Sequence, residues 1–181
     1  RIDSDMIITD DISSCWEGDF DVAVVNNANP REIKAQINLM GGVVTVWTVK
    51  PEDYVNCGFV VVKSEAFVDH WLGLCMSDHF KNYQYREQDL LNIMVFYMGK
   101  TFNGPYTVKF LDTSDKFHGL IWKGYEPMVR LENGKLILPK NDEWPKDSDK
   151  EVVCWHVAGG NIPNKMNYRS RFQPDVIKHI D

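Results

Sequence analysis

The run Phe59–Val62 constrains the fold more than any other segment of the chain. Its four apolar residues follow Asn56-Cys57-Gly58 without alternating with polar side chains. Such a continuous run is typical of a strand that is buried on both faces of its sheet. Strands mixed with helices around it, and hairpins toward the C-terminus, predict an α/β fold with a mixed central sheet flanked by helices.

Two further strands and a helix are predicted before this run. Asp21–Val25 and Val43–Val49 are rich in β-branched residues, which favours strands. Asn29-Pro30 is a typical helix start. Ile33, Ile37 and Met40 follow at spacings of four and three, so the pattern predicts a helix that ends at Gly41-Gly42.

Two helices are predicted after the run. Ser64 can cap a helix from Glu65 to about His79. Its inner stripe would be formed by Phe67, Trp71, Leu74 and Cys75. A second helix is predicted from Arg86 to Met98, and it is apolar nearly all round, as a core helix would be.

The second half of the chain favours short strands. Tyr106–Leu111, Gly119–Trp122 and Val152–His156 are strand candidates. Met128–Leu138 has Asn133-Gly134 at its centre, and these two residues supply the positive φ values of a type I′ hairpin turn. Residues 139–150 form a polar loop, and a short helix is expected at the C-terminus after a basic loop, 165–171.

Composition limits the classes of function. The chain has 181 residues, with 20 basic and 26 acidic side chains and a net charge of −6. This balance argues against nucleic acid or an anionic membrane as the main partner, since both need a basic surface. No apolar run approaches the roughly 18 residues of a membrane span. The four cysteines are scattered, which predicts reduced, buried thiols and a cytoplasmic protein.

Two sets of polar residues are candidates for metal binding. Asp3-Ser4-Asp5 lies near the start of the chain, where a turn can bring both carboxylates to one cation. His156 ends a buried strand, and imidazole is an acceptable ligand for Mn²⁺ among carboxylates. The alternatives are a solvated surface loop for the aspartates and a structural role for the histidine.

Two other polar segments are candidates for binding a sugar. Glu87-Gln88-Asp89 opens the second predicted helix, where carboxylates can also simply stabilise the helix N-terminus. Asn56 precedes Gly58 at a strand start, where glycine permits close approach of a ligand, although a plain turn explains the pair equally well.

Taken in order, four motifs resemble the GT-A-fold glycosyltransferases, and most closely the retaining group that includes glycosyltransferase family 8. They are the Asp-x-Asp of Asp3 and Asp5, the segment 54–62 (YVNCGFVVV), the segment 87–92 (EQDLLN) and the segment 156–159 (HVAG). The resemblance spans the chain from Asp3 to Gly159. It implies a metal-dependent enzyme that moves a sugar from a nucleotide-diphosphate donor, with UDP favoured, to a carbohydrate or glycoconjugate acceptor with retention.

The resemblance also implies roles for individual residues. Asp3, Asp5 and His156 would hold Mn²⁺ or Mg²⁺ against the donor diphosphate, which becomes a good leaving group when a cation neutralises its charge. Gln88, Asp89 and Glu87 would be the catalytic group. Asn56, Gly58 and Gly159 would bind the donor.

The chain departs from the family pattern in three places. The lysine expected three residues after Gly159 is replaced by Ile162, so phosphate contact is assigned to Lys165, with Arg169 and Arg171 as rivals. Glu87 stands where the family has aspartate, which bears on sugar choice. Only two residues precede Asp3, so the single catalytic domain, 1–181, is expected to lack an upstream portion that contacts the nucleotide base and ribose.

Acceptor binding is expected in the later half of the chain. Trp122, Tyr125 and Trp144 lie near polar loops, and aromatic faces pack on sugar rings. Two other functions remain open. A carbohydrate-binding module would use the tryptophans and acidic loops without catalysis, and a nucleotidyltransferase would share the architecture and the metal.

Overall fold

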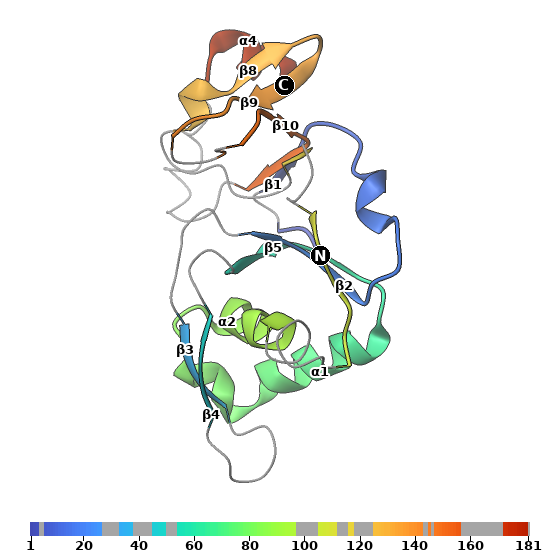
Figure 1. Ribbon diagram of the computed structural model, residues 1–181, viewed down its shortest axis with the longest axis vertical. Coiled ribbons are helices and arrows are strands. Elements are labelled where there is room, and N and C mark those ends of the chain that lie inside the picture. The colour runs from blue at the N-terminus through green and yellow to red at the C-terminus, as the bar shows by residue number, and fades with distance from the viewer. Residues whose placement is uncertain are drawn as a thin grey trace. The chain divides into compact units, whose positions relative to one another are not determined.

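A computed structural model describes residues 1–3, 6–26, 33–37, 45–49, 54–96, 105–111, 116–117, 125–142, 145, 147–156 and 172–180. These residues form several small sheets and a few helices, so the protein is mixed α/β (Figure 1). The chain divides into two compact units. Unit 1 is Arg1 with Gly18–Phe110, and unit 2 is Ile2–Glu17 with Leu111–Asp181.

Unit 1 is built on a three-stranded sheet. Its order is β5 (Val55–Val62), β2 (Val22–Asn26) and β6 (Val108–Phe110), with β2 antiparallel to β5 and parallel to β6. Helices α1 (Glu65–Met76) and α2 (Arg86–Ile93) pack against each other and contact β5 (Figure 1). All eight residues of β5 except Val62 are buried, which confirms the prediction from the apolar run.

The core of unit 1 joins the sheet to α2. Leu90, Leu91 and Ile93 are each at most 2% exposed. Burial of an aliphatic side chain of this size contributes about 1.5–3 kcal/mol before chain entropy is subtracted. The buried cluster comprises Val22, Val24, Tyr54, Val55, Cys57, Val60, Phe67, Leu90, Leu91, Ile93, Met94, Val95 and Phe96.

The two helix starts of unit 1 differ in their capping. Ser64 Oγ accepts the N–H of Phe67 at 3.2 Å, so the predicted cap of α1 is confirmed. The helix ends at Met76, earlier than predicted, and the 3₁₀ helix Asp78–Asn82 follows. The α2 segment is helical from Arg86 to Ile93 and then makes one π-helical turn over residues 94–96.

The prediction of a helix through Ile33, Ile37 and Met40 is wrong where the structure describes it. Ile33–Ile37 is strand β3, and it pairs antiparallel with β4 (Thr45–Val49) through five residue pairs. Apolar residues at positions 33 and 37 fit a helical face, but with Ala35 between them they also fit the period of a strand. Cross-strand pairing with the predicted strand β4 decided between the two periods.

The described part of unit 2 contains two sheets. One pairs β1 (Met6–Ile8) with β11 (Cys154–His156). The other has the order β7 (Lys116–Phe117), β10 (Lys150–Val152), β9 (Lys135–Leu138) and β8 (Arg130–Glu132). The described part of unit 2 also includes the 3₁₀ helices Ser13–Trp16 and Glu126–Met128, and helix α4 (Pro174–Ile180). Its buried cluster comprises Val129, Leu136, Leu138, Val152, Trp155, Phe172 and Val176.

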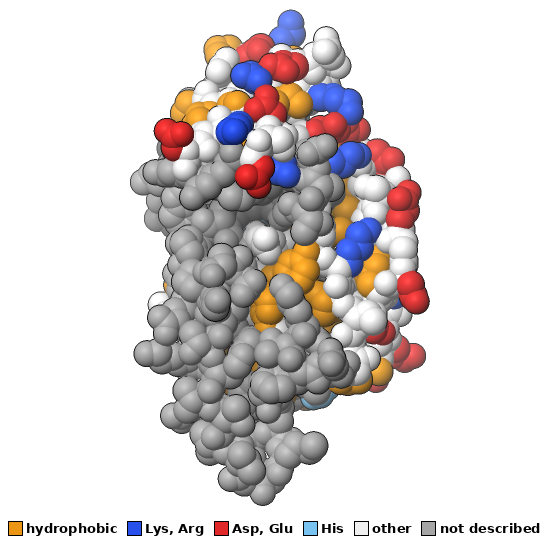
Figure 2. Space-filling view, viewed as in Figure 1, with side chains coloured by type: hydrophobic (Ala, Val, Ile, Leu, Met, Phe, Trp, Pro, Cys, Tyr) orange, Lys and Arg blue, Asp and Glu red, His pale blue; other side chains and the backbone are white. Residues whose placement is uncertain are grey.

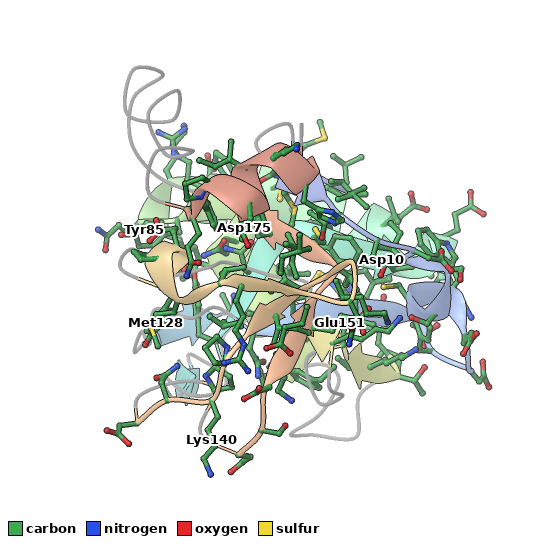
Figure 3. The ribbon with its side chains drawn as sticks, turned by 90° about the horizontal axis from the view of Figure 1, so that it is seen from above. Asp10, Tyr85, Met128, Lys140, Glu151 and Asp175 are labelled. Carbon is green, nitrogen blue, oxygen red and sulfur yellow. The ribbon has the colours of Figure 1, made fainter. Side chains whose placement is uncertain are left out.

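The exposed side of the β8–β9–β10 sheet is lined with ion pairs. Lys135 contacts Glu151 at 2.8 Å and Arg130 contacts Asp149 at 2.8 Å. Figure 2 shows acidic and basic side chains interspersed over this part of unit 2, and Figure 3 labels Glu151 on β10. Exposed pairs of this kind contribute about 0–1 kcal/mol each, so the apolar cluster of unit 2 matters more for its stability.

The predicted hairpin is confirmed, and it gives a test of backbone conformation. Asn133 has φ +51° and Gly134 has φ +77°. A Cβ at Gly134 would meet no atom within 4 Å, so only the left-handed backbone penalises a side chain there. We expect Gly134→Ala to lower the free energy of unfolding by about 1 kcal/mol.

Gly73 in α1 is the matched control for this variant. Its φ lies outside the left-handed region and it also has open space around it. Gly73→Ala is expected to raise the free energy of unfolding by about 0.5–1 kcal/mol, since alanine favours a helix interior. Urea unfolding measures the free energy of unfolding of both variants. Changes of the same sign in both would contradict the conclusion that the left-handed backbone at Gly134 penalises a side chain.

Asp21 ties the start of β2 to the segment before β6, and it gives a test of pH dependence. Its Oδ2 accepts the N–H of Thr107 at 2.7 Å and the Thr107 hydroxyl at 2.8 Å. These hydrogen bonds to the carboxylate lower the pKa of Asp21 below its usual value of 3.8. The group therefore adds stability that is complete above the unfolded pKa and is lost as the pH falls through the lower, folded pKa.

Asp21→Asn should lose this pH-dependent part of the stability. We expect the variant to be less stable than the wild type at pH about 7, and the difference to shrink as the pH falls below about 4. Urea midpoints measured across this range check the result. Asp69→Asn, an exposed change on α1, is the control, and an Asp21→Asn deficit that is constant with pH would contradict the mechanism.

Four further predicted elements are present in the structure. Asp21–Val25, Val43–Val49, Tyr106–Leu111 and the C-terminal helix correspond to β2, β4, β6 and α4. The predicted strand Val152–His156 is divided at Val153 into the end of β10 and the whole of β11. Gly119–Trp122 and the loop 165–171 lie outside the described residues. All four cysteines are free thiols, and Cys75 is the one that is only partly buried.

Candidate functional site

Strand pairing in unit 2 brings Asp3 to His156. Met6 lies opposite His156 in the β1–β11 register, and the N–H of Met6 donates to the carbonyl of Asp3 at 3.1 Å. Asp3 Oδ2 lies 3.7 Å from His156 Nε2, although the residues are far apart in the sequence. Thr9 secures the end of β1, because its hydroxyl donates to the carbonyl of Val152 at 2.7 Å.

The orientation of His156 follows from strand geometry. Successive side chains on β11 point to opposite faces. Trp155 is directed into the core of unit 2, where it is 1% exposed and stacks on Phe172 at 4.7 Å between ring centroids. His156 is therefore directed to the other face, toward Asp3. It is 6% exposed, whereas the Asp3 side chain is 28% exposed.

The distance between these two side chains lies between the two ligand spacings of an octahedral cation site. A separation of 3.7 Å is too long for a strong hydrogen bond. Two ligand atoms at about 2.1 Å from one ion lie about 3.0 Å apart at a right angle and about 4.2 Å apart on opposite sides. An oxygen and an imidazole nitrogen are also suitable donors for Mn²⁺.

The third predicted ligand, Asp5, lies outside the described residues. Within the part of the chain that is described, no group of three or more His, Cys, Asp or Glu side chains could hold a metal ion. The described residues thus contain two of the three predicted ligands, Asp3 and His156, next to each other.

The second set of predicted site residues lies in unit 1, where β5 meets the start of α2. Val24 faces Val60 on β5, but the next residue, Val25, faces Asn56, so residues 57–59 bulge out of the ladder. Side chains accept hydrogen bonds from the backbone of this bulge. Gln88 Oε1 accepts the N–H of Cys57 at 3.1 Å, and Asn56 Oδ1 accepts the N–H of Gly58 at 2.7 Å.

Asp89 is buried and its two carboxylate oxygens make separate hydrogen bonds. Oδ1 accepts the hydroxyl of Tyr54 at 2.7 Å, and Oδ2 accepts the N–H of Tyr85, the residue before α2, at 2.9 Å (Figure 3 labels Tyr85). The second bond satisfies a backbone donor at a helix start, as a capping side chain does. Asp89 is 4% exposed.

Gln88 and Glu87 are more accessible than Asp89. Gln88 is partly exposed, and its Nε2 donates to the Tyr54 hydroxyl at 2.9 Å. The side chain of Glu87 is 40% exposed and lies 3.8 Å from the Arg1 guanidinium. Both residues are therefore placed where a ligand can reach them.

Tyr54 and Asn92 lie within the segments 54–62 and 87–92, but the sequence predictions gave neither of them a role. Tyr54 bridges Gln88 and Asp89. Asn92 is fully buried and clamps β5 to α2, since it accepts the N–H of Val55 at 2.7 Å and donates to the carbonyls of Val55 and Gln88 at 2.8 Å each. Tyr54 lies directly before the buried strand β5 and Asn92 directly before the buried residues 93–96, so a polar group beside a buried segment was the signal available for both.

We call Tyr54, Asn56, Gln88, Asp89 and Asn92 the β5–α2 network. Four other predicted site residues lie outside the described residues: Gly159, Lys165, Trp122 and Trp144. In the described part of the chain, no helix has the length and apolar character that crossing a membrane requires.

The chain matches no protein-family model, no curated protein and no solved structure in the comparisons. The resemblance to the GT-A glycosyltransferases therefore depends on the four short motifs and, within unit 2, on the proximity of Asp3 to His156.

Proposed function

We propose that the chain is the catalytic part of a GT-A-fold glycosyltransferase that uses a divalent cation and a nucleotide-diphosphate sugar. The observation that carries the proposal is the 3.7 Å distance between Asp3 Oδ2 and His156 Nε2. The motif resemblance predicted that these residues, one at each end of the motif series, share a cation. Their proximity supports that reading over unrelated roles, a solvated loop for Asp3 and a structural role for His156.

The chemistry of the pair suits a diphosphate leaving group. A bound Mn²⁺ or Mg²⁺ would neutralise negative charge that develops on the diphosphate as the bond to the sugar breaks. Asp3, His156 and Asp5 would hold that ion. The aspartates supply the hard oxygen ligands that such ions prefer.

In the same proposal the partly exposed Gln88 contacts the donor sugar, and Glu87 borders it. An amide near the reactive carbon can stabilise an oxocarbenium-like centre, as in glycosidic chemistry generally. UDP is the favoured nucleotide, the acceptor is a carbohydrate or glycoconjugate, and retention of configuration is favoured.

A screen of nucleotide sugars for Mn²⁺-dependent hydrolysis tests the proposal without knowledge of the acceptor. We expect release of UDP from one donor with Mn²⁺ present, and loss of release when the cation is chelated. In parallel, calorimetric titration should show that UDP binds only with Mn²⁺.

Two results would contradict the proposal. Binding of free sugars with no response to UDP or Mn²⁺ would indicate a carbohydrate-binding module. Release of pyrophosphate from a nucleoside triphosphate and a sugar phosphate would indicate a nucleotidyltransferase.

A further inference from the structure

The β5–α2 network contains a hydrogen-bond chain with a fixed direction. The Tyr54 hydroxyl donates its proton to Asp89 Oδ1 at 2.7 Å. The phenol oxygen can then only accept from Gln88. Gln88 must therefore turn its Nε2 to Tyr54 at 2.9 Å, which leaves its Oε1 facing the N–H of Cys57 at 3.1 Å.

The opposite orientation of the Gln88 amide is penalised at both ends. It would place Oε1 against a phenol oxygen whose proton is already donated, and Nε2 against the N–H of Cys57. Each end would then face a group of its own kind, and mispaired buried polar groups cost about 1–3 kcal/mol. The hydrogen bond from Tyr54 to Asp89 thus sets the orientation of an amide that Asp89 does not contact.

Tyr54, Asp89 and Gln88 differ in their exposure to solvent. Tyr54 is 0% exposed and Asp89 is 4% exposed, whereas Gln88 is partly exposed. After its two hydrogen bonds, the Gln88 amide retains one N–H proton and one oxygen lone pair. Gln88 is therefore the member of this chain that can touch a ligand.

We propose that Tyr54 and Asp89 are positioning residues that fix the orientation of the Gln88 amide for the donor sugar. This inference rests on the proposed function, and it revises the role of Asp89 from catalytic contact to positioning. The expected benefit is a preorganised group, since side chains at reactive sites need support from their own hydrogen-bond partners.

Tyr54→Phe tests the inference, because it removes the phenol oxygen and keeps the ring. We expect kcat for donor hydrolysis to fall about tenfold with little change in the donor KM. In a Gln88→Ala background the same change should cost no further activity. An equal, additive loss in that background would overturn the inference.

Tyr106→Phe is the matched control. Tyr106 is a second tyrosine of unit 1, partly buried where Tyr54 is fully buried, with its hydroxyl donating to the Ala66 carbonyl at 3.3 Å and lying 3.2 Å from His70 Nδ1. Both of these partners are on α1, and Tyr106 is not part of the proposed site. Its kcat should stay at the wild-type value.

A measurement that needs no activity separates this inference from the proposed function. Amide hydrogen exchange of Cys57 should rise at least about tenfold in Tyr54→Phe, because Gln88 no longer holds its acceptor in place. The N–H of Val55, held by Asn92, should be unaffected. Unchanged exchange at Cys57 overturns the positioning role even in an active enzyme, whereas a wild type without transferase activity overturns only the proposed function.

Gln88→Glu gives a second test if Tyr54→Phe does not fold. When the introduced carboxyl is ionised, it competes with Asp89 for one phenol proton, whereas in its protonated form it can donate to Tyr54 and accept from Cys57. Relative to wild type, kcat and the protection of the Cys57 amide should both recover as the pH is lowered from about 8 to about 5. Parallel pH profiles for variant and wild type would overturn the inference.

Discussion

Asp3→Asn and His156→Gln are each expected to lower Mn²⁺-dependent donor hydrolysis at least about a hundredfold. Both changes keep the approximate size of the side chain. The first removes a negative charge, and the second removes the imidazole nitrogen that faces Asp3 at 3.7 Å. Initial rates of UDP release over a range of Mn²⁺ concentrations provide the measurement. Part of the loss should be recovered at high Mn²⁺, since weaker ligands raise the concentration of ion that is required.

Asp142→Asn is the control for these variants. Asp142 is an exposed acid of the same unit, in the loop after β9. It should retain wild-type activity and Mn²⁺ dependence. The cation proposal would be contradicted if Asp3→Asn and Asp142→Asn had the same activity. It would also be contradicted if Asp3→Asn or His156→Gln lost activity through a large loss of thermal stability while its Mn²⁺ requirement stayed unchanged.

Asn92→Ala is expected to lower the free energy of unfolding by about 3 kcal/mol. The change removes three hydrogen bonds and leaves the buried N–H and carbonyl of Val55 without the side chain that satisfies them. A buried backbone group without a partner costs about 1–3 kcal/mol, so two of them account for a loss of this size. Urea unfolding followed by tryptophan fluorescence is the measurement.

Gln84→Ala is the control for this prediction. Gln84 is an exposed amide in the turn before α2, and its truncation should change stability by less than about 0.5 kcal/mol. An Asn92→Ala loss of less than about 1 kcal/mol would show that α2 and β5 are held together mainly by apolar packing.

Sequence patterns succeeded where the interactions are local. Ser64 caps α1 through an N–H three residues away, and Asn133-Gly134 closes its own hairpin. In both cases the residues that decide the structure lie within one turn of chain. Ile33–Ile37 shows the limit of this reasoning, because its pattern satisfied two periods and β4 decided between them.

The sequence named Gln88 and Asp89 as candidates but did not distinguish their roles. The order of the motifs singled out Gln88 and Asp89 together, yet the structure gives them different surroundings. Gln88 is accessible, whereas Asp89 is buried and bonded to Tyr54 and Tyr85. Burial depends on how α2 packs on β5, and no short segment contains that information.

The amino-acid sequence by itself determined the α/β class, the buried strand β5, the capped helix α1 and the type I′ turn, because each depends on neighbours along the chain. Only the tertiary structure decided that Asp3 lies 3.7 Å from His156 and that Tyr54 links Asp89 to Gln88. These contacts close long loops, whose entropic cost is met by strand pairing and core packing in the folded unit as a whole.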